Sequence, residues 1–592
     1  MNFSVSHRDF DIVVIGSGGA GLMAAISAME NGAKNVAVIS KVSPNNSHTV
    51  SAKGGINAAL GNVMQDDWKW HAYDTLKGAD YLADADAVEI LCRNAKDAII
   101  ELERMGVVFS RDVNGNIAQR AYGGQTGDFG KGGLAYRACY SKDKTGQTIL
   151  HTLYEQAVKK GVKFFSEYFV TDLFIDDKKS YGCLAVDLNN GELVVFESVS
   201  TILATGGYSQ IYQNTTSSLI CSGDGSALVF EAGIPLQDME FVQFHPTGIH
   251  GLGFLITEAA RGEGGYLLNS LGERFMQNYA PKMLELASRD VISQAMAIEI
   301  HAGRGCGVKK DFLHLDLRHL SDEVLKNKLP GVVDLVRSFA RLDVKKDLIP
   351  VAPSAHYTMG GVPTNLDCVV IDENSEIEGL MAVGEAACLS VHGANRLGCN
   401  SLLDLIVFGK IAGEKAAKKP AQKNCNLVKK LADVKIEKLN KIFVQNAQSN
   451  QSSLDSLKKD LQSNNEKNLG VFRQQNLLEL GLQKTTEIFA NFQNYRIKNK
   501  SLIWNEELVE YFELKNLLLN SLAANFSALN RHESRGAHYR SDFLQRDDAN
   551  FAKHSLVKFS ETKENKLEFL LKSVRNSSEV PELNLSFQAR KY

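Results

Sequence analysis

The first forty residues contain two short apolar runs separated by a glycine-rich turn. Residues 10–15 form a continuous apolar run, and runs of this length are typical of strands buried on both faces of a parallel sheet. After the glycines, an apolar and alanine-rich stretch to about Glu30 predicts a helix. Residues 36–40 then predict a second strand. The pattern therefore indicates a strand, helix and strand at the start of an α/β domain.

Helical and strand patterns continue along the rest of the chain. Helical spacing extends to about Met105, whereas alternating apolar runs over residues 162–199 predict the strands of a small sheet. Residues 201–207 predict a further buried strand that ends in glycines. From about 427 to 529, apolar positions recur at helical spacing with Lys, Asn and Gln between them, which predicts a bundle of long helices.

Composition and charge exclude several classes of protein. The chain of 592 residues is 44% hydrophobic and 23% charged, with a net charge of -3, which is ordinary for a soluble globular protein and offers no basic field for nucleic acid. No apolar run reaches the roughly 18 residues of a membrane span, and the polar N-terminus lacks a signal region. The nine cysteines form no CxxC pair. We therefore expect a cytosolic chain without a zinc site or an iron–sulfur cluster of its own.

A dinucleotide-binding fingerprint lies between the first predicted strand and helix. Residues 16–21 have the pattern G-x-G-x-x-G: Gly16 permits a tight turn, Gly18 lets the backbone approach a pyrophosphate, and Gly21 lets the helix pack on the strand. An acidic residue is expected at the end of the second strand to hold a ribose, but Ser40 and Lys41 stand there. This substitution weakens the case for NAD.

Polar residues are grouped beside glycines in several later stretches. A small dicarboxylate needs two donor-rich pockets, and Arg, His and Thr are suitable donors. His245, Thr257, His356 and Arg396 supply such a set. These residues lie partly in the segment 235–353, whose dense polar groups indicate an inserted substrate-capping domain. A substrate could therefore bind between this segment and the nucleotide-binding domain.

Taken together, these elements resemble the flavoprotein subunits of succinate dehydrogenase and fumarate reductase. The resemblance covers about residues 8 to 550. Its elements, in chain order, are 16–21, 47–50, 245–248, 257–265, 288–290, 356–361, 380–386, 392–404, 470–473 and 533–540. In that family the histidine matching His48 in Ser-His-Thr-Val is bonded to the flavin. Considered alone, this stretch could equally be a polar turn.

The resemblance implies roles for further residues. It implies that Arg289 donates the proton in fumarate reduction, with Glu258 and Arg261 as its pathway to solvent. Residue chemistry alone would favour a histidine, because a guanidinium with a pKa above 12 is a poor acid. The residues expected to hold FAD, bound covalently through His48, are Gly16, Gly18, Gly19, Gly21, Ser40, Lys41, His48, Thr49, Gly54, Gly55, Gly206, Asp224, Glu385, Arg396, Ser401 and Leu402.

Some residues near the predicted cofactor site lie at the starts of predicted helices, where a capping role is also expected. Asp224 follows a glycine before a predicted helix, so it either caps that helix or contacts the cofactor. Asn400 or Ser401 is expected to cap the helix that follows the 392–404 run, with the N-terminus of that helix facing the flavin ring. A lysine- and alanine-rich stretch with Pro420, residues 415–423, predicts a linker.

The predicted fold class is α/β: a Rossmann-like FAD-binding domain with an inserted α+β capping domain, then a C-terminal helical domain and a tail. The predicted boundaries are 1–234 and 354–418 for the FAD-binding domain, 235–353 for the capping domain, 419–530 for the helical domain and 531–592 for the tail. The resemblance also implies electron transfer to an iron–sulfur subunit and a membrane anchor with quinone. It places the chain on the cytoplasmic face of the cell membrane.

Two departures from the family and two rival functions remain open. Relatives usually have Arg where this chain has Asn46, and Lys53 stands where succinate oxidisers tend to have Gln and fumarate reducers Glu. The working direction is left open. One rival is an L-aspartate oxidase-like flavoenzyme, which holds FAD without a covalent link, and the other is a non-catalytic flavin electron carrier.

Overall fold

The computed structural model describes residues 3–373, 375–419, 424–443, 452–560, 566–578 and 580–585. Within these residues the largest sheet has eight strands, in the order β16-β17-β8-β9-β1-β2-β6 with β7 paired to β8. These strands are β1 (Val5–Ile15), β2 (Val36–Ser40), β6 (Lys163–Ser166), β7 (Tyr168–Asp176), β8 (Lys179–Asp187), β9 (Leu193–Leu203), β16 (Val369–Asp372) and β17 (Ser375–Ala382). The expectation of a separate small sheet over residues 162–199 is wrong, because β6 pairs with β2 and β9 with β1.

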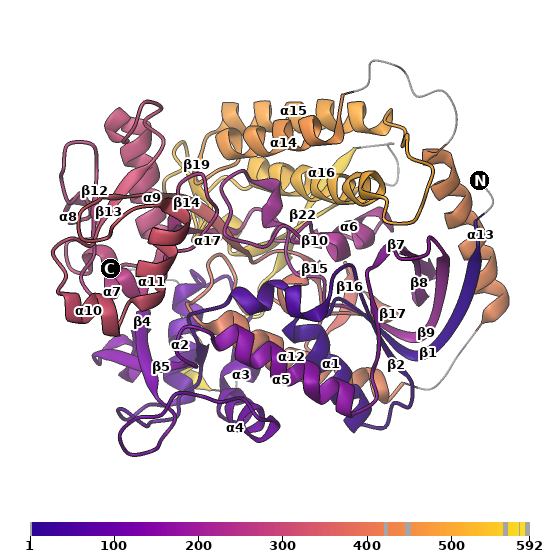
Figure 1. Cartoon of the computed structure of the whole chain (residues 1–592), viewed down its shortest axis with the longest axis horizontal. Helices are drawn as coiled ribbons and strands as arrows, with labels where there is room; N and C mark the ends of the chain where they lie inside the picture. Colours follow the sequence, from indigo (N-terminus) through magenta and orange to yellow (C-terminus); the bar gives the residue numbers. More distant parts are fainter. Residues whose placement is uncertain are drawn as a thin grey trace.

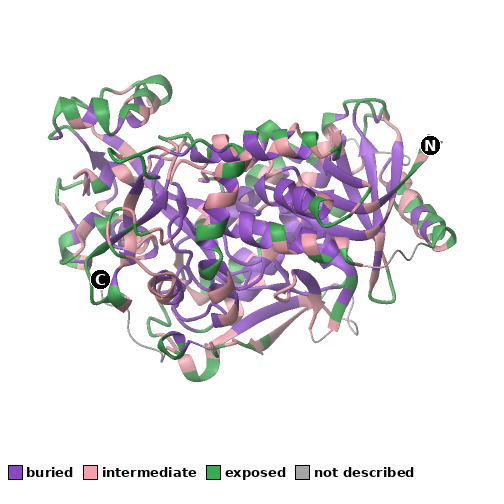
Figure 2. Cartoon of the chain, turned by 90° about the horizontal axis from the view of Figure 1, so that it is seen from below, coloured by how far each residue is buried: buried purple, intermediate pink, exposed green. Residues whose placement is uncertain are grey.

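The core of the sheet follows from the alternation of side chains along β1. Ile12 and Val14 belong to one buried hydrophobic cluster, and Val13 and Ile15 belong to another on the opposite face. β1 runs parallel to both β2 and β9, and both faces of the sheet are buried along residues 12–15 and 36–39, which explains why these two stretches are apolar without interruption. Figure 2 shows the buried residues gathered in the sheet and the surrounding helices.

Three helices cover one face of the sheet: α1 (Gly19–Glu30), α5 (Thr145–Lys159) and α12 (Asn400–Ala417), which lie together in Figure 1. α1 is buried from Gly19 to Ala28 on every side, as its uniformly apolar sequence requires. α12 approaches it closely because Gly413 has no side chain; a Cβ there would lie 2.2 Å from the oxygen of Ala24. Gly409, one turn earlier, similarly lies against the first turn of α1, since a Cβ there would be 2.9 Å from the oxygen of Ala20.

The segment between β9 and β16 contains a second sheet, with the strand order β11-β14-β13-β12. Each neighbouring pair in this sheet is antiparallel. Its strands are β11 (Val242–Ile249), β12 (Tyr266–Leu268), β13 (Leu313–Asp316) and β14 (Ile349–Thr358). The short helices beside them are α7 (Ala259–Gly262), α8 (Met276–Tyr279), α9 (Arg289–Glu299), α10 (Asp322–Asn327) and α11 (Pro330–Leu335). A hydrophobic cluster of its own, from Ile249 to Val351, packs this region. The predicted boundary at residue 353 falls inside β14, so the two predicted domains share a continuous strand.

Long helices follow, as the periodicity predicts: α13 (Cys425–Ile442), α14 (Leu454–Asn468), α15 (Gln475–Gln493) and α16 (Glu506–Asn530). α14, α15 and α16 lie side by side in Figure 1. α16 also packs against α6 (Asp224–Glu231), beside the central sheet. α12 continues to Ala417 through the start of the predicted linker, and residues 420–423 of that linker lie outside the described residues.

The remaining elements complete the surface around this core. In the tail, β21 (Lys553–Phe559) and β22 (Leu567–Ser573) form a sheet with β10 (Leu236–Gln237). The other elements are α2 (Trp68–Gly78), α3 (Ala85–Arg93), α4 (Ala95–Met105), α17 (Asp548–Phe551), β3 (Ile56–Asn57), β4 (Gln119–Thr126), β5 (Leu134–Cys139), β15 (Val362–Pro363), β18 (Ala387–Cys388), β19 (Phe472–Arg473) and β20 (Tyr539–Arg540). Among the described residues, no helix combines the length and apolar character that a membrane crossing requires.

Candidate active site

A cavity of about 1080 Å³ is lined both by ends of central-sheet strands and by the inserted segment. Its lining contains every residue predicted to hold FAD except Gly21, and all four predicted dicarboxylate ligands. Arg289 and Glu258 also line it, whereas Arg261 does not. Residues predicted from distant parts of the sequence are therefore brought together in one place.

Glycines shape one end of the cavity. Gly16 has φ +113°, and a Cβ there would lie 2.2 Å from the oxygen of Ala204. A Cβ at Gly21 would lie 2.0 Å from the oxygen of Gly16, so Gly21 permits the packing of α1 on β1 without lining the cavity. The N–H of Gly19 donates to Thr49 Oγ1 over 3.1 Å, which ties the loop carrying His48 to the start of α1.

Ser40 and Lys41 occupy the end of β2, and Lys41 is an ion-pair partner of Asp224. Ser40 Oγ accepts a hydrogen bond from Ser17 (2.8 Å), and Lys41 Nζ lies 2.9 Å from Asp224 Oδ2. Asp224 does not cap α6, because the N-cap residue is Gly223 with φ +69°. The carboxylate faces Lys41 at the cavity instead.

His48 lies in a 3₁₀ turn, His48–Ser51, on the cavity wall. Its Nδ1 accepts a hydrogen bond from the backbone N–H of Ser218 (3.2 Å), and Nε2 has no hydrogen-bond partner among the described residues. Burial lowers the pKa of His48 to about 4, so the ring is neutral at physiological pH. Nε2 is therefore the ring nitrogen left for a bond to a ligand.

The start of α12 lies at the cavity without a side-chain cap. Its N-cap is Cys399, with φ +66°, and Ser401 lines the cavity. Asn400 does not cap the helix, because its Oδ1 accepts hydrogen bonds from Asn57 Nδ2 (2.7 Å) and His71 Nε2 (2.8 Å) in a buried network. The prediction that Asn400 or Ser401 caps α12 is wrong. The free N–H groups and the helix dipole instead favour negative charge at this point of the cavity.

Glu385 lies in the 3₁₀ turn Gly384–Ala386 after β17 and lines the cavity. Its Oε1 accepts hydrogen bonds from the backbone N–H of Thr358 (3.0 Å) and from Thr358 Oγ1 (3.2 Å). Burial raises the pKa of Glu385 to about 7 despite these bonds. The carboxyl is therefore held in a fixed position on the wall formed by the central sheet.

Two guanidinium groups, from Arg289 and Arg396, meet at the oxygen of one amide. Arg289 is the first residue of α9, and Arg396 lies in the loop before α12. The Oε1 of Gln243, which is fully buried, accepts from Arg289 Nη1 (3.2 Å) and from Arg396 Nη2 (3.0 Å). Burial and the Arg289 charge lower the pKa of Arg396 to about 10, so it remains a cation at neutral pH. The cavity thus has two adjacent positive charges.

Two neutral histidines lie beside these cations. The rings of His245 and His356, on the paired strands β11 and β14, are 5.2 Å apart. Burial and the nearby charge of Arg289 hold the pKa of each ring well below its usual value. His245 Nδ1 accepts from the N–H of Thr247 (3.3 Å), so the neutral ring carries its proton on Nε2. With Thr257 also in the lining, this part of the cavity can donate several hydrogen bonds to carboxylates.

The predicted proton pathway is contiguous but buried. Arg289 Nε donates to Glu258 Oε2 over 3.1 Å, and Arg261 Nη2 lies 3.8 Å from the same oxygen. Burial alone would raise the pKa of Glu258, but Arg289 and Arg261 lower it below its usual value. The Arg261 side chain has no exposed surface, so the predicted relay must continue beyond Arg261 to reach solvent. Arg261 next donates to the oxygen of Glu285, whose carboxylate binds the partly exposed Arg274.

The sequence interpretation missed Gln243, although it lies two residues before His245. Residues at positions i and i+2 of a strand point to the same face, so this spacing was a usable signal. It also missed Ser218, which binds His48, and Glu513, which binds Lys41 from α16 at 2.6 Å. No local pattern relates residues so far apart in the chain.

Comparisons with known proteins identify the family. Residues 11–402 match the model of the FAD binding domain, and residues 458–592 match the model described as fumarate reductase flavoprotein C-term. A succinate dehydrogenase flavoprotein subunit of Rickettsia conorii is 50% identical over 566 residues, covering 94% of each chain. The chain belongs to the succinate dehydrogenase and fumarate reductase flavoprotein family. Other members of this flavoprotein family match over most of their length.

These members include enzymes named for opposite directions of the reaction. A mitochondrial succinate dehydrogenase [ubiquinone] flavoprotein subunit of Oryza sativa is 50% identical, covering 94% of this chain and 89% of its own. The 8-methylmenaquinol:fumarate reductase flavoprotein subunit of Wolinella succinogenes is 42% identical, covering 92% and 88%. A solved quinol fumarate reductase chain of E. coli superposes with a TM-score of 0.91 at 34% identity and 98% coverage of both chains.

The cavity of this flavoprotein family member fits FAD, the cofactor of the family's binding domain. Gly18 lines the cavity and leaves its backbone bare where a pyrophosphate would approach, and the start of α1 offers N–H groups. Ser47 and Arg396 line the cavity, and the buried atoms Ser47 Oγ and Arg396 Nε have no hydrogen-bond partner among the described residues. Buried polar atoms of this kind normally have a partner, so a polar ligand is expected beside them.

Proposed function

We propose that this chain interconverts succinate and fumarate as the FAD-carrying subunit of a quinone-linked complex. The observation that carries the proposal is the convergence of Arg289, Arg396, His245 and His356 on the cavity that contains the FAD-binding glycines. A four-carbon diacid carries two carboxylates, and two cations flanked by neutral imidazole donors complement that charge. The names of relatives at 42% to 50% identity support the same activity.

In the proposed mechanism, bound FAD supplies the acceptor or donor of a hydride. Arg396 holds one substrate carboxylate, and His245 Nε2–H and Thr257 orient the rest of the diacid. Succinate oxidation breaks two C–H bonds: one hydrogen leaves as hydride with its electron pair, the other as a proton, and the electrons of the second bond form the C=C bond. Fumarate reduction reverses these changes.

Arg289 transfers the proton in this proposal. For fumarate reduction, an Nη of its guanidinium donates to the alkene carbon, and the proton is replaced through Glu258, whose Oε2 lies 3.1 Å from Arg289 Nε. Arg261 and Glu285 extend the chain of contacts away from the cavity. The shared amide of Gln243 fixes the Arg289 side chain relative to Arg396 and so limits where the proton is delivered.

A covalent bond between His48 Nε2 and a carbon of FAD forms part of the proposal. Its formation would replace the Nε2–H bond and one C–H bond of the cofactor, both hydrogens would leave as protons, and the electron pair of the C–H bond would reduce the flavin. Support comes from the neutral ring, the occupied Nδ1 and the position of His48 in the cavity wall. Such a link would keep the cofactor from dissociating between turnovers. An L-aspartate oxidase-like enzyme would lack this bond.

We further propose that the electrons pass to an iron–sulfur subunit and then to quinone at a membrane anchor on the cytoplasmic face of the cell membrane. Support comes from relatives named as ubiquinone- and menaquinol-linked enzymes. This chain aligns with nearly the whole length of those subunits, which favours an arrangement in which separate subunits carry the iron–sulfur clusters and the quinone site. Affinity purification of the chain from its membranes, followed by iron analysis of the associated proteins, tests this part.

The experiment that tests the activity compares three dicarboxylates on the purified chain with an artificial dye. We expect turnover with succinate and, in reverse, with fumarate, and none with L-aspartate. Acid precipitation after unfolding should leave the flavin absorbance in the pellet. Turnover of L-aspartate together with release of flavin into the supernatant would instead favour the oxidase alternative.

A further inference from the structure

The end of β2 lacks the acidic residue that dinucleotide-binding units usually have there to hold a ribose. Lys41 occupies the place, and it lines the cavity. Its ammonium lies 2.6 Å from Glu513 Oε1, 2.9 Å from Asp224 Oδ2 and 2.7 Å from Ser222 Oγ. Two carboxylates from other elements therefore surround the ammonium at the end of β2, one of them 472 residues away in the sequence.

Glu513 lies on a face of α16 that contacts the turn before α6. Asn516 and Asn520, three and seven residues further on, share this face. Asn516 Nδ2 donates to Asp224 Oδ1 (2.9 Å), and Asn520 Nδ2 donates to the oxygen of Gly223 (3.0 Å). α16 thus holds Asp224 from one side while Glu513 holds its ion-pair partner.

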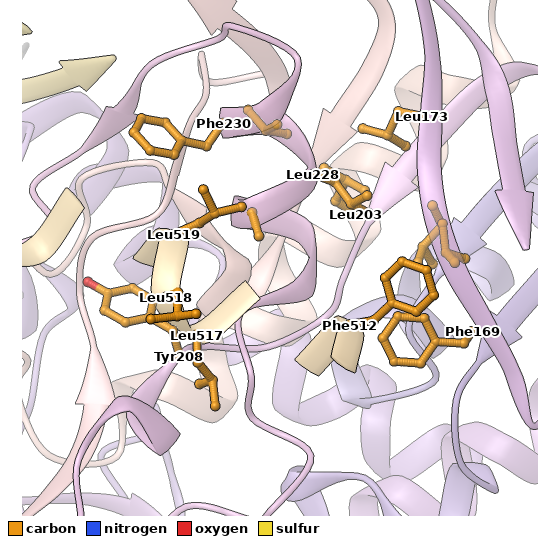
Figure 3. Packing of buried hydrophobic residues seen from close by; sticks show 14 of the residues in the cluster. Phe169, Leu173, Leu203, Tyr208, Leu228, Phe230, Phe512, Leu517, Leu518 and Leu519 are labelled. Carbon is orange, nitrogen blue, oxygen red and sulfur yellow. The ribbon is translucent and has the colours of Figure 1, made fainter. Parts of the chain in front are cut away.

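An aromatic contact joins the same helix to the cavity wall. The ring of Phe512 stacks on Phe169 of β7 with centroids 5.4 Å apart, as Figure 3 shows, and Phe169 lines the cavity. Lys41 Nζ lies 5.6 Å from the centre of the Phe169 ring. Two consecutive residues of α16 therefore support two neighbouring parts of one wall.

The charges of this cluster are largely removed from water. The side chains of Lys41, Asp224 and Glu513 are 13%, 14% and 17% exposed. Burial alone would lower the pKa of Lys41, but Asp224 and Glu513 raise it above its usual value, so the lysine is charged. Charge-assisted hydrogen bonds in such surroundings are strong and directional. Removing Glu513 would leave the ammonium free to turn toward Asp224 or the cavity.

We propose that Glu513 is a positioning residue for the nucleotide end of the FAD site. It holds the ammonium of Lys41 between itself and Asp224, which fixes the two charged groups that line the cavity where the ribose of a dinucleotide binds in this fold. The C-terminal helical region is then part of the cofactor site rather than a support without chemistry. The inference depends on FAD binding and not on the identity of the dicarboxylate.

The test measures binding of FAD and of ADP to the full-length chain carrying His48→Ala, which keeps flavin exchangeable. In this background we compare Glu513→Gln with Glu507→Gln, the matched control. Glu507 lies on the same helix, accepts a hydrogen bond from the Tyr495 hydroxyl (2.7 Å) and does not line the cavity. We expect Glu513→Gln to weaken both FAD and ADP about tenfold, and Glu507→Gln to change neither by more than about twofold.

A double-mutant cycle with Lys41→Met separates positioning from a general loss of stability. If Glu513 acts through Lys41, the double variant binds FAD no more weakly than Lys41→Met alone. Additive losses, an equal loss in Glu507→Gln, or unchanged ADP binding in Glu513→Gln would each overturn the proposal. If Glu513→Gln is too unstable to titrate, Glu513→Asp is used in its place and must bind FAD and ADP more weakly than the control variant does.

Discussion

Replacement of Gln243 by Met tests whether the two arginines work as a fixed pair. The side chain is fully buried, and Met has a similar length but no acceptor or donor of comparable strength. In the native chain Gln243 Oε1 accepts from both Arg289 and Arg396, while Nε2 donates to Asn395 Oδ1 and to the oxygen of Arg396, each over 2.8 Å. The substitution removes all four hydrogen bonds.

The expected loss follows from the two bonds to charged groups. A hydrogen bond to an ionised partner contributes about 1.5 to 3 kcal/mol, and the diacid can replace part of it when it binds. We therefore expect Gln243→Met to lose about 2 to 3 kcal/mol of transition-state stabilisation, which is about 30- to 150-fold in kcat/KM for fumarate. Much of the loss should appear in kcat, because Arg289 no longer points in a fixed direction.

Steady-state kinetics with a reduced dye and fumarate provide the assay, with flavin content measured on the same samples. Gln119→Met is the matched control, because Gln119 is a buried amide that donates to the oxygens of Ala58 and Arg137 and does not line the cavity. We expect the control to lose stability but to keep kcat/KM. Equal kcat/KM in the native chain and Gln243→Met would refute the argument that the amide fixes the two cations.

Three further outcomes follow from the structure. Arg289→Gln should keep its flavin and lose succinate and fumarate turnover, and normal turnover would exclude it as proton donor. His48→Ala should release its flavin on acid precipitation while still binding it when folded. Burial alone would lower the pKa of His554, but Asp238 and Asp84 raise it from 6.5 to about 9. The contribution of protonated His554 to the free energy of unfolding is therefore fully present below about pH 6.5 and is lost as the pH rises through about 9. Thermal unfolding between about pH 6 and 10 should thus depend less on pH in His554→Gln, and identical profiles would contradict this reasoning.

The sequence was informative about the fold wherever the signal was local. The apolar run before Gly16 and the fingerprint after it predict β1 and α1, because a strand, a tight turn and a helix start are set by neighbouring residues. The place of residues 163–203 in the central sheet depends on pairing between strands distant in the chain, such as β1 with β9. Nothing within those segments distinguishes a small separate sheet from an extension of a larger one.

The candidate site likewise contains residues that local motifs predict and contacts that only the fold brings together. His48, His245 and Arg396 were predicted from their motifs, and all three line one cavity. The prediction that Asn400 caps α12 is wrong, because an asparagine at a helix start is suited both to capping and to a buried hydrogen-bond network. Only the fold shows that Asn57 and His71 lie beside it. The contact of Glu513 with Lys41 could not be predicted, since a carboxylate on a long helix looks identical whether it faces water or an ion pair.

Anaerobic absorption spectroscopy of the purified chain tests the central claim most directly. The claim is that the FAD in this cavity exchanges reducing equivalents with a four-carbon diacid held by Arg289, Arg396 and the two histidines. The account predicts that succinate bleaches the visible flavin band and that fumarate restores it in the dithionite-reduced chain. A flavin band that neither diacid changes, in a chain with full FAD content, would contradict the account.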